Sequence, residues 1–246
     1  MEVQSEAIAA QANYEELSTA WHDGQRYNPA TLHRRRLMFQ ILKKIDFQSV
    51  LEIGCGQPYL MQSIQALRPN IAYTGTDISK ALIESNRKEY PSGRFEVLDI
   101  VNQNLPEQFD LIIATESLEH VPDYHKALKN LAGMARKYIL ITVPSSKVFP
   151  IDRMIGHFRH YKPEDMIKPL EELGFKTTIA YKWGFPFHNL YKHLINTIST
   201  PEKMQKTFAE GEFTPMKRFV SKVLYWLFFL NIKSWGYQLV LLAERK

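Results

Sequence analysis

The chain has 246 residues, 45% of them hydrophobic and 23% charged, so it can bury a full core and has the composition of a globular protein. Its net charge of +5 agrees equally with simple solubility, an anionic substrate or a membrane surface. The single cysteine excludes an internal disulfide framework and a Cys-rich metal site, and we expect no metal. We see neither a secretory signal nor an apolar run long enough to span a bilayer, and therefore expect a cytoplasmic protein.

The first predicted unit is an amino-terminal helical cap, residues 1–45. Residues 1–27 are predicted to form a helix followed by a loop, and residues 31–44 a stronger helix with its apolar side chains on one side. The second helix also carries Arg34, Arg35 and Arg36. We interpret this basic cluster as a solvated face rather than an anion site.

A strand, a glycine loop and a helix follow over residues 50–67. The apolar run ends at Glu52, and Gly54 and Gly56 then turn the chain, which is typical of a nucleotide-type cofactor site. Pro58 has no N–H for a pyrophosphate, and the charge of Glu52 opposes a phosphate but attracts a cation. S-adenosylmethionine fits, because it is an adenosine without phosphates that carries positive charge. We interpret Cys55, between the glycines, as a small buried residue rather than a nucleophile.

Two further strands are predicted to end in acids. Asp77 closes the strand at 71–76 and follows Gly56 by 21 residues, the spacing at which a carboxylate accepts hydrogen bonds from a ribose. The alternative is that Asp77 caps the helix at 80–88, although Ser79 can also do so. Asp99 follows the strand at 94–98, and Ile100 comes directly after it. An acceptor beside an apolar side chain suits an adenine ring.

The next segments continue the alternation of strand and helix. Residues 109–115 form a continuous apolar strand, a helix is centred on 127–131, and a fifth strand spans 138–143. This alternation predicts a parallel sheet whose ligands lie at the carboxyl ends of its strands. Glu52, Asp77, Asp99 and the segment 115–120 should therefore converge in one crevice.

These motifs resemble those of the class I S-adenosylmethionine-dependent methyltransferases over residues 50–174. The family's first motif reads acidic-x-Gly-x-Gly-x-Gly, and here Pro58 replaces the third glycine. The resemblance implies a Rossmann-like, seven-stranded, mostly parallel sheet with helices on both faces and an antiparallel last strand. It implies S-adenosylmethionine as cofactor, with these cofactor-binding residues: Glu52, Gly54, Cys55, Gly56, Asp77, Ile78, Asp99, Ile100, Thr115 and Glu116.

Histidines are the candidate catalytic residues. The segment Thr115-Glu116-Ser117-Leu118-Glu119-His120 resembles the fourth motif of small-molecule methyltransferases, which implies that His120 lies near the point of methyl transfer. The segment 157–165 precedes a helix at 166–173, and many such enzymes carry a similar stretch, so it should border the acceptor pocket. His120 and His160 are the predicted general bases, with His157 a weaker candidate. Alternatively, these histidines only order the loop through hydrogen bonds.

The remaining chain completes a single predicted domain. We expect a cofactor-binding core at 46–182, whose sixth strand lies at 176–182, a helical insertion on the acceptor side at 183–236, and a last strand at 237–246. The aromatic run 219–230 has three interpretations. It is a helix buried against the sheet or in a homodimer interface, it walls an apolar acceptor pocket, or, least favoured, it lies on a membrane surface.

We therefore predict a methyltransferase that acts on an O or N atom of a small organic acceptor, such as an apolar, lipid-like or secondary metabolite. The alternative is a methyltransferase-like protein that binds or regulates without catalysis. A nicotinamide-dependent oxidoreductase is less favoured, because Tyr59 stands where the third glycine of its loop would be. A nucleic-acid acceptor is disfavoured, because the chain has no concentrated basic tract.

Overall fold

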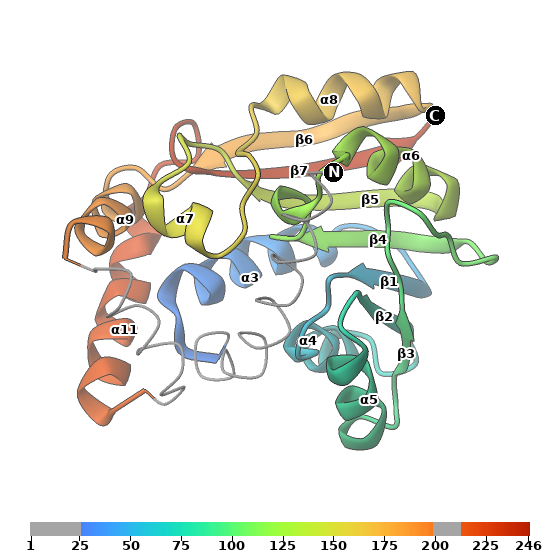
Figure 1. Ribbon diagram of the computed structural model, residues 1–246, viewed down its shortest axis with the longest axis horizontal. Helices are drawn as coiled ribbons and strands as arrows, with labels where there is room; N and C mark the ends of the chain where they lie inside the picture. The colour runs from blue at the N-terminus through green and yellow to red at the C-terminus, as the bar shows by residue number, and fades with distance from the viewer. Residues whose placement is uncertain (1–25, 199–212) are drawn as a thin grey trace, which may run out of the picture.

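A seven-stranded sheet runs through the protein in the order β3-β2-β1-β4-β5-β7-β6 (Figure 1). The structure is a computed structural model and describes residues 26–198 and 213–246. All neighbouring strands pair in parallel except β7, which is antiparallel to both β5 and β6. The predicted Rossmann-like sheet with an antiparallel last strand is therefore confirmed. The strands are β1 Ser49–Ile53, β2 Ala72–Asp77, β3 Arg94–Val97, β4 Phe109–Thr115, β5 Ala135–Pro144, β6 Phe175–Trp183 and β7 Gln238–Arg245.

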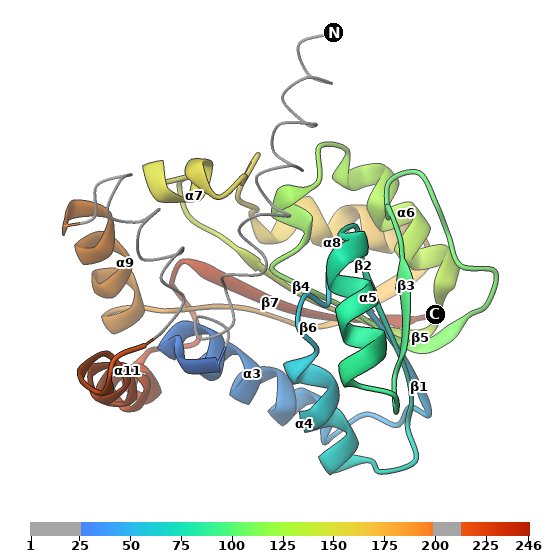
Figure 2. The same cartoon turned by 60° about the horizontal axis from the view of Figure 1, so that its bottom comes forward.

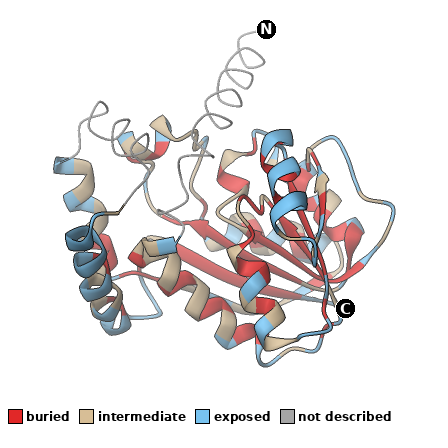
Figure 3. Cartoon of the chain, turned by 90° about the horizontal axis from the view of Figure 1, so that it is seen from below, coloured by how far each residue is buried: buried red, intermediate tan, exposed pale blue. Residues whose placement is uncertain are grey.

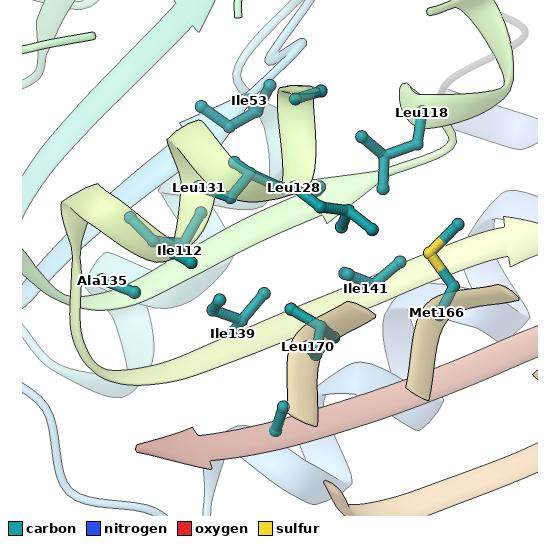
Figure 4. Packing of buried hydrophobic residues seen from close by; sticks show 14 of the residues in the cluster. Ile53, Ile112, Leu118, Leu128, Leu131, Ala135, Ile139, Ile141, Met166 and Leu170 are labelled. Carbon is teal, nitrogen blue, oxygen red and sulfur yellow. The ribbon is translucent and has the colours of Figure 1, made fainter. Parts of the chain in front are cut away.

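Helices cover both faces of the sheet and bury two separate apolar clusters. On one face, α6 (Tyr124–Met134) and α8 (Pro163–Glu172) direct Leu128, Leu131, Met166 and Leu170 onto the strands (Figure 4). The other face is covered by α3 (Pro29–Leu42), α4 (Tyr59–Leu67) and α5 (Lys80–Glu89). A sheet covered on both faces requires continuously apolar central strands, and the first six of the seven residues of β4 are buried.

Most predicted elements agree with the observed ones to within a few residues. The predicted helix at 31–44 is α3, which begins at Pro29 because the Asn28 side chain accepts the Ala30 N–H at 2.9 Å as a cap. The prediction missed α7 (Pro150–Met154), which is only five residues long. The prediction for residues 1–27 falls almost wholly outside the described residues. No helix in the described ranges is long and apolar enough to cross a bilayer.

The insertion before β7 is helical, as predicted, and lies at one end of the molecule. It contains α9 (Phe187–Ile198) and α11 (Pro215–Leu227), followed by a short 3-10 turn, η2 (Phe228–Leu230) (Figures 1 and 2). Helix α11 packs against α3, and Ser221 is its only buried residue. The interpretation of residues 219–230 as a helix buried against the sheet is therefore wrong.

Candidate active site

The topology of the sheet places a crevice at the carboxyl end of β1. Strand β1 pairs with β2 on one side and with β4 on the other. The connection after β1 therefore runs to one side of this strand, and the connection after β3 crosses back to its other side. Such a switch point leaves an opening between the loops that follow the two strands. The loop after β1 and the loop after β4 therefore form the two walls of the candidate site.

The glycine loop after β1 has a backbone that other residues adopt only with strain. Gly54 and Gly56 have φ angles of +66° and +50°. A Cβ on Gly54 would lie 2.9 Å from the Cβ of Ser117, so the two walls meet closely. Between the glycines, Cys55 is buried, and burial raises the pKa of its thiol well above the ordinary value. This cysteine is a small packed residue in a tight turn.

Asp77 joins the ends of the first two strands. Its Oδ2 accepts the N–H of Gly56 at 3.0 Å, and its Oδ1 accepts the N–H of Ser79 at 3.0 Å. The cap of α5 is Ser79, whose hydroxyl accepts the N–H of Leu82 at 3.3 Å. Each carboxylate oxygen has two lone pairs, so Asp77 can hold the loop and still accept a hydroxyl of a bound ribose.

Three further predicted cofactor-binding residues follow β2 and β3: Ile78, and the predicted adenine residues Asp99 and Ile100. Ile78 is 38% exposed beside Asp77, so it offers an apolar surface at the crevice. Asp99 is half-buried, with its two oxygens accepting the N–H of Val101 at 2.9 Å and the side-chain amide of Asn102 at 2.7 Å. Ile100 is buried in the core cluster on the α6 face, so its side chain presents little surface to a ligand.

Glu52 is buried at the end of β1, beside the buried side chain of Tyr73. The Tyr73 hydroxyl donates to Oε2 of Glu52. Burial raises the pKa of Glu52 to about 7, and the Tyr73 bond and the Arg35 charge oppose that rise. A cationic ligand nearby would favour the ionised carboxylate for the same electrostatic reason as Arg35 does.

Glu116 begins the second wall in a left-handed backbone conformation, with φ at +49°. Its N–H donates to the Thr142 carbonyl at 2.9 Å, and its Oε2 lies 3.3 Å from both an Arg34 nitrogen and the amide nitrogen of Gln238. Its Oε1 is buried and has no hydrogen-bond partner among the described residues. The neighbouring Thr115 hydroxyl lies 3.7 Å from the sulfur of Met38. Backbone strain at such a position is characteristic of functional sites.

The arginines of α3 are not a solvated face, and that prediction is wrong. Arg34 is buried in its ion pair with Glu116, while the guanidinium groups of Arg35 and Arg36 lie over the rings of Tyr59 and Phe229, at 5.2 and 3.7 Å from the centroids. A signal was present in the sequence, because Arg34 precedes the apolar Leu37 and Met38 by three and four residues and so shares their side of the helix.

A histidine cluster borders the second wall. Two hydrogen bonds fasten the segment 157–161 to the turn at Leu118–His120, from the Tyr161 hydroxyl to the Leu118 carbonyl at 2.6 Å and from the Phe158 N–H to the Glu119 carbonyl at 2.9 Å. These bonds place the rings of His120 and His157 4.7 Å apart between centroids, and Nδ1 of His157 3.0 Å from Nε2 of His160.

The hydrogen bonds of His160 indicate its tautomer. The Ser146 hydroxyl donates to the Lys147 carbonyl at 2.8 Å, so its oxygen accepts from Nδ1 of His160 at 3.0 Å. Nε2 then accepts a hydrogen bond from Nδ1 of His157 at 3.0 Å and cannot donate to the Asp152 carboxylate, whose Oδ2 is 3.4 Å away. The Lys192 ammonium lies 3.1 Å from the other oxygen of Asp152 and offsets its charge.

Burial keeps the cluster histidines uncharged at neutral pH. It lowers the pKa of His120 and of His160 to about 4 and that of His157 to about 2, with the neighbouring His120, His160 and Lys192 adding to the effect at His157. Neutral imidazoles can accept a proton from a bound acceptor. The structure thus brings both predicted catalytic histidines, and His157, into one group.

Glu119 is a member of this cluster that sequence reasoning missed. It is fully buried, and neither carboxylate oxygen has a hydrogen-bond partner within the described ranges. Burial first, and then the Glu116 charge, raise its pKa well above the ordinary value. The only signal in the sequence was its place directly before His120 in the segment after β4.

Two sets of side chains here could hold a metal ion. The ligand atoms of Glu119, His120 and His157 lie within 4.8 Å of one another, as do those of Asp152, His157 and His160. Lys192 already occupies a position beside Asp152, whereas Glu119 lacks hydrogen-bond partners. The set that includes Glu119 is therefore the better suited of the two to a cation.

Comparison with known proteins finds similarity to methyltransferases in the region that carries these motifs. Residues 51–137 match the model of a methyltransferase domain. The chain is 32% identical over 141 residues to trans-aconitate 2-methyltransferase from Variovorax paradoxus, which covers 52% of this chain and 54% of that protein. It is 33% identical over 85 residues to malonyl-[acyl-carrier protein] O-methyltransferase from Priestia megaterium, covering 34% of this chain and 31% of that protein. The matches thus span about half or less of these curated relatives.

Solved structures share the fold across the whole chain at low identity. The N-methyltransferase NodS from Bradyrhizobium japonicum has a TM-score of 0.58 at 15% identity and covers 94% of this chain and 97% of that one. Magnesium protoporphyrin IX methyltransferase from Synechocystis has a TM-score of 0.58 at 15% identity, with both chains fully covered. The stretch that carries the glycine loop and the acids described above, residues 51–137, is therefore similar to a methyltransferase domain.

Proposed function

We propose that this protein transfers a methyl group from S-adenosylmethionine to an O or N atom of a small organic acceptor. The observation that carries the proposal is the gathering of three carboxylates, Glu52, Asp77 and Glu116, with a glycine loop, at the carboxyl ends of three adjacent strands. Carboxylates suit a cofactor with hydroxyls and positive charge and disfavour one with phosphates.

The residues present fit this cofactor at several points. The buried Oε1 of Glu116 has no hydrogen-bond partner among the described residues. We assign Asp77 to the ribose hydroxyls and Asp99, with Ile78, to the adenine. We assign Glu52 and Glu116, which follow the central strands, to the charged end of the cofactor.

The cofactor supplies an electrophilic methyl group on a sulfonium, which leaves as a neutral thioether when the acceptor attacks the carbon. Much of the catalysis can come from positioning the two reactants. An acceptor hydroxyl or protonated amine must also lose a proton, and we assign this role to the neutral His120 and His160. His157 joins the two through its ring contact with His120 and its hydrogen bond to His160.

The acceptors named for two relatives give a first set to test. One relative is named for trans-aconitate and the other for malonyl-[acyl-carrier protein], both of which are carboxylic acids. The residues of this chain beyond 182 lie outside the matched methyltransferase domain at 51–137 and include the insertion that we assign to the acceptor side. A screen should therefore include acids and apolar small molecules alike.

The test is transfer of a labelled methyl group from S-adenosylmethionine to fractions of a small-molecule extract. We expect label in a small-molecule fraction, and loss of that signal in the His120→Asn/His160→Asn double variant. Absence of label in every fraction, from a protein that binds the cofactor, would favour the alternative of a binding or regulatory protein without catalysis.

A further inference from the structure

Helix α11 has an apolar stripe that faces away from the protein. Six side chains recur every three or four residues and share one side of the helix, with exposed fractions from 44% to 69%: Met216, Phe219, Val220, Val223, Trp226 and Leu230. The opposite side packs inward, where Ser221 and Phe228 are buried. The stripe is therefore a second apolar face and is not the side that anchors α11 to α3.

Neighbouring elements extend this stripe into a larger surface. Helix α9 exposes Leu190, Leu194 and Ile198 at intervals of four residues, and the segment after η2 exposes Ile232 and Trp235. The two helices lie side by side, because Tyr191 of α9 lines the same shallow pocket of about 240 Å³ as Met216 and Val220 of α11. We call the stripe and these five residues the apolar end; it lies where Figure 3 shows exposed residues along α9 and α11.

The charge on the described residues around the apolar end is positive. Residues 183–198 and 213–243 contain no Asp or Glu, and four of their cations, Lys217, Arg218, Lys222 and Lys233, belong to α11 or to the segment after η2, whereas Lys192 faces Asp152. The intervening sequence 199–212, outside the described residues, adds three Glu and two Lys. Lys217 and Lys222 are exposed on α11 itself. An apolar surface of this extent marks an interaction site. A second copy of the chain is a poor occupant, because a two-fold interface would bring the cations of α11 together with no Asp or Glu among the described residues of this surface to pair with them.

We propose that the apolar end docks on the surface of an anionic phospholipid bilayer. Helix α11 would lie in the plane of the interface, with Phe219 and Leu230 among the acyl chains and Trp226 at the level of the headgroups. Lys217 and Lys222 flank the stripe and would contact the lipid phosphates. The helix is too short to span the bilayer, so the attachment is peripheral.

Helix α9 connects this surface to the histidine cluster. Its outward side belongs to the apolar end, whereas its other side contacts α7, where Lys192 pairs with Asp152 at 3.1 Å and Asn196 accepts the N–H of Ile151 at 3.4 Å. The cluster therefore lies about one helix diameter, ~10 Å, behind the docked surface. If the proposed function also holds, the acceptor is a lipid or a lipid-linked molecule. Docking itself does not depend on methyl transfer, so the two tests fail independently.

The test is flotation of the full chain with vesicles of phosphatidylcholine, with and without phosphatidylglycerol. We expect binding to the anionic vesicles that salt weakens. Each basic residue near such a surface contributes about 1 kcal/mol, so Lys217→Gln/Lys222→Gln should lower the partition coefficient about 30-fold. The matched control is Lys129→Gln/Lys168→Gln, which removes the same charge from exposed positions on α6 and α8 and should bind nearly as the wild type does.

A second pair of variants tests the apolar contribution. Phe219→Ser/Trp226→Ser should abolish flotation and leave the thermal midpoint nearly unchanged, because both side chains are exposed. Val97→Ser, an exposed apolar position on strand β3, should have no effect on flotation. In the wild type we expect the tryptophan emission to shift to the blue with vesicles, and Trp226→Phe should diminish that shift.

Three results would overturn the proposal. The first is a wild type that does not float with anionic vesicles. The second is equal loss of binding in the Lys217/Lys222 and the Lys129/Lys168 variants, which would show a non-specific effect of net charge. The third is a dimer in solution that Phe219→Ser/Trp226→Ser converts to a monomer, which would assign the apolar end to a second copy.

Discussion

Asp77 has two roles at the residue scale, and they can be separated by substitution. Its carboxylate accepts the backbone N–H groups of Gly56 and Ser79, and we also assign to it the binding of the ribose hydroxyls. Asp77→Asn keeps the shape but replaces one acceptor oxygen by an amide donor. We expect S-adenosylmethionine to bind about 5- to 150-fold more weakly, which corresponds to the ~1–3 kcal/mol cost of an unsatisfied buried group. Isothermal titration measures this.

The control for Asp77 is Asp46→Asn, because Asp46 is exposed and forms only a surface ion pair with Arg68 at 3.8 Å. The affinity of the Asp46→Asn variant for the cofactor should equal that of the wild type. Thermal unfolding of both variants shows whether the loss comes from the loop or from the ligand. Wild-type affinity in Asp77→Asn would remove the ribose role and leave Asp77 as a structural tie.

The proposed role of His160 as a proton acceptor can be tested by kinetics. Because burial lowers its pKa to about 4, it is neutral and able to accept a proton throughout the neutral pH range. His160→Asn should lower kcat by ~10²–10⁴ on the acceptor found by labelled transfer, with unchanged affinity for the cofactor. Partial recovery with added imidazole would distinguish a proton acceptor from a residue that only orders the loop. Unchanged kcat would contradict the assignment.

Glu119 and the partner of Arg34 show what the sequence does not reveal about single residues. Glu119 stands in a quoted motif, but its burial depends on the packing of the segment 157–161, which is distant in the sequence. Arg34 is paired with Glu116 across 82 residues, and isolated charges on a helix are ordinarily solvated. By contrast, the positions of Asp77 and Asp99 were predictable, because parallel strands bring their carboxyl ends to one edge.

At the element scale, the site depends on the close approach of the loops after β1 and β4. Gly54→Ala would place a Cβ 2.9 Å from that of Ser117 and put a non-glycine residue at φ +66°. The backbone alone costs about 1–2 kcal/mol, and we expect a lower thermal midpoint and loss of cofactor binding. The double variant Gly54→Ala/Ser117→Gly should recover part of the stability, because it removes the clash and leaves the strain.

The matched control is Gly133→Ala in helix α6, where an added Cβ meets nothing within 4 Å. Alanine is a better helix former by ~1 kcal/mol, so this variant should be slightly more stable than the wild type. If Gly54→Ala behaves like Gly133→Ala, the two walls are not in the close contact described here.

The elements that the sequence predicted best are those whose pattern has one physical explanation. Strand β4 is a continuous apolar run because both faces of the sheet are covered, and its predicted and observed limits coincide. Helix α7 has five residues, too few to show a helical period, so it was missed. The exposed stripe of α11 has the same residue types as a buried face, and only the structure shows which side is covered.

At the scale of the whole molecule, buried histidines dominate the expected response to acid. Burial lowers the pKa of His33 and His188 to about 3, His120 and His160 to about 4 and His157 to about 2. Between these pKa values and the unfolded value of about 6.5, the unfolded chain binds more protons than the folded chain does. The histidines therefore lower the free energy of unfolding as the pH falls. Glu52 and Glu119 act oppositely, because their raised pKa values favour the folded state at lower pH.

The five histidines outnumber the two glutamates, so the free energy of unfolding should decrease from pH 6.5 to 4.5. Thermal unfolding across this range measures the slope. His188→Gln should make the slope shallower, because it removes one buried histidine, whereas His125→Gln, at an exposed position, should leave it unchanged. A midpoint that stays constant or rises on acidification would contradict this balance.

The most direct test of the proposed function is isothermal titration of the protein with S-adenosylmethionine, with its demethylated product S-adenosylhomocysteine, and with NADH. The residues at the ends of β1, β2 and β4 predict that the first two bind with dissociation constants below about 1 mM and that NADH does not bind, because Pro58 has no N–H for a pyrophosphate and the carboxylates of Asp77 and Glu116 oppose its charge. Failure of both adenosyl compounds to bind, or stronger binding of NADH, would contradict the proposal.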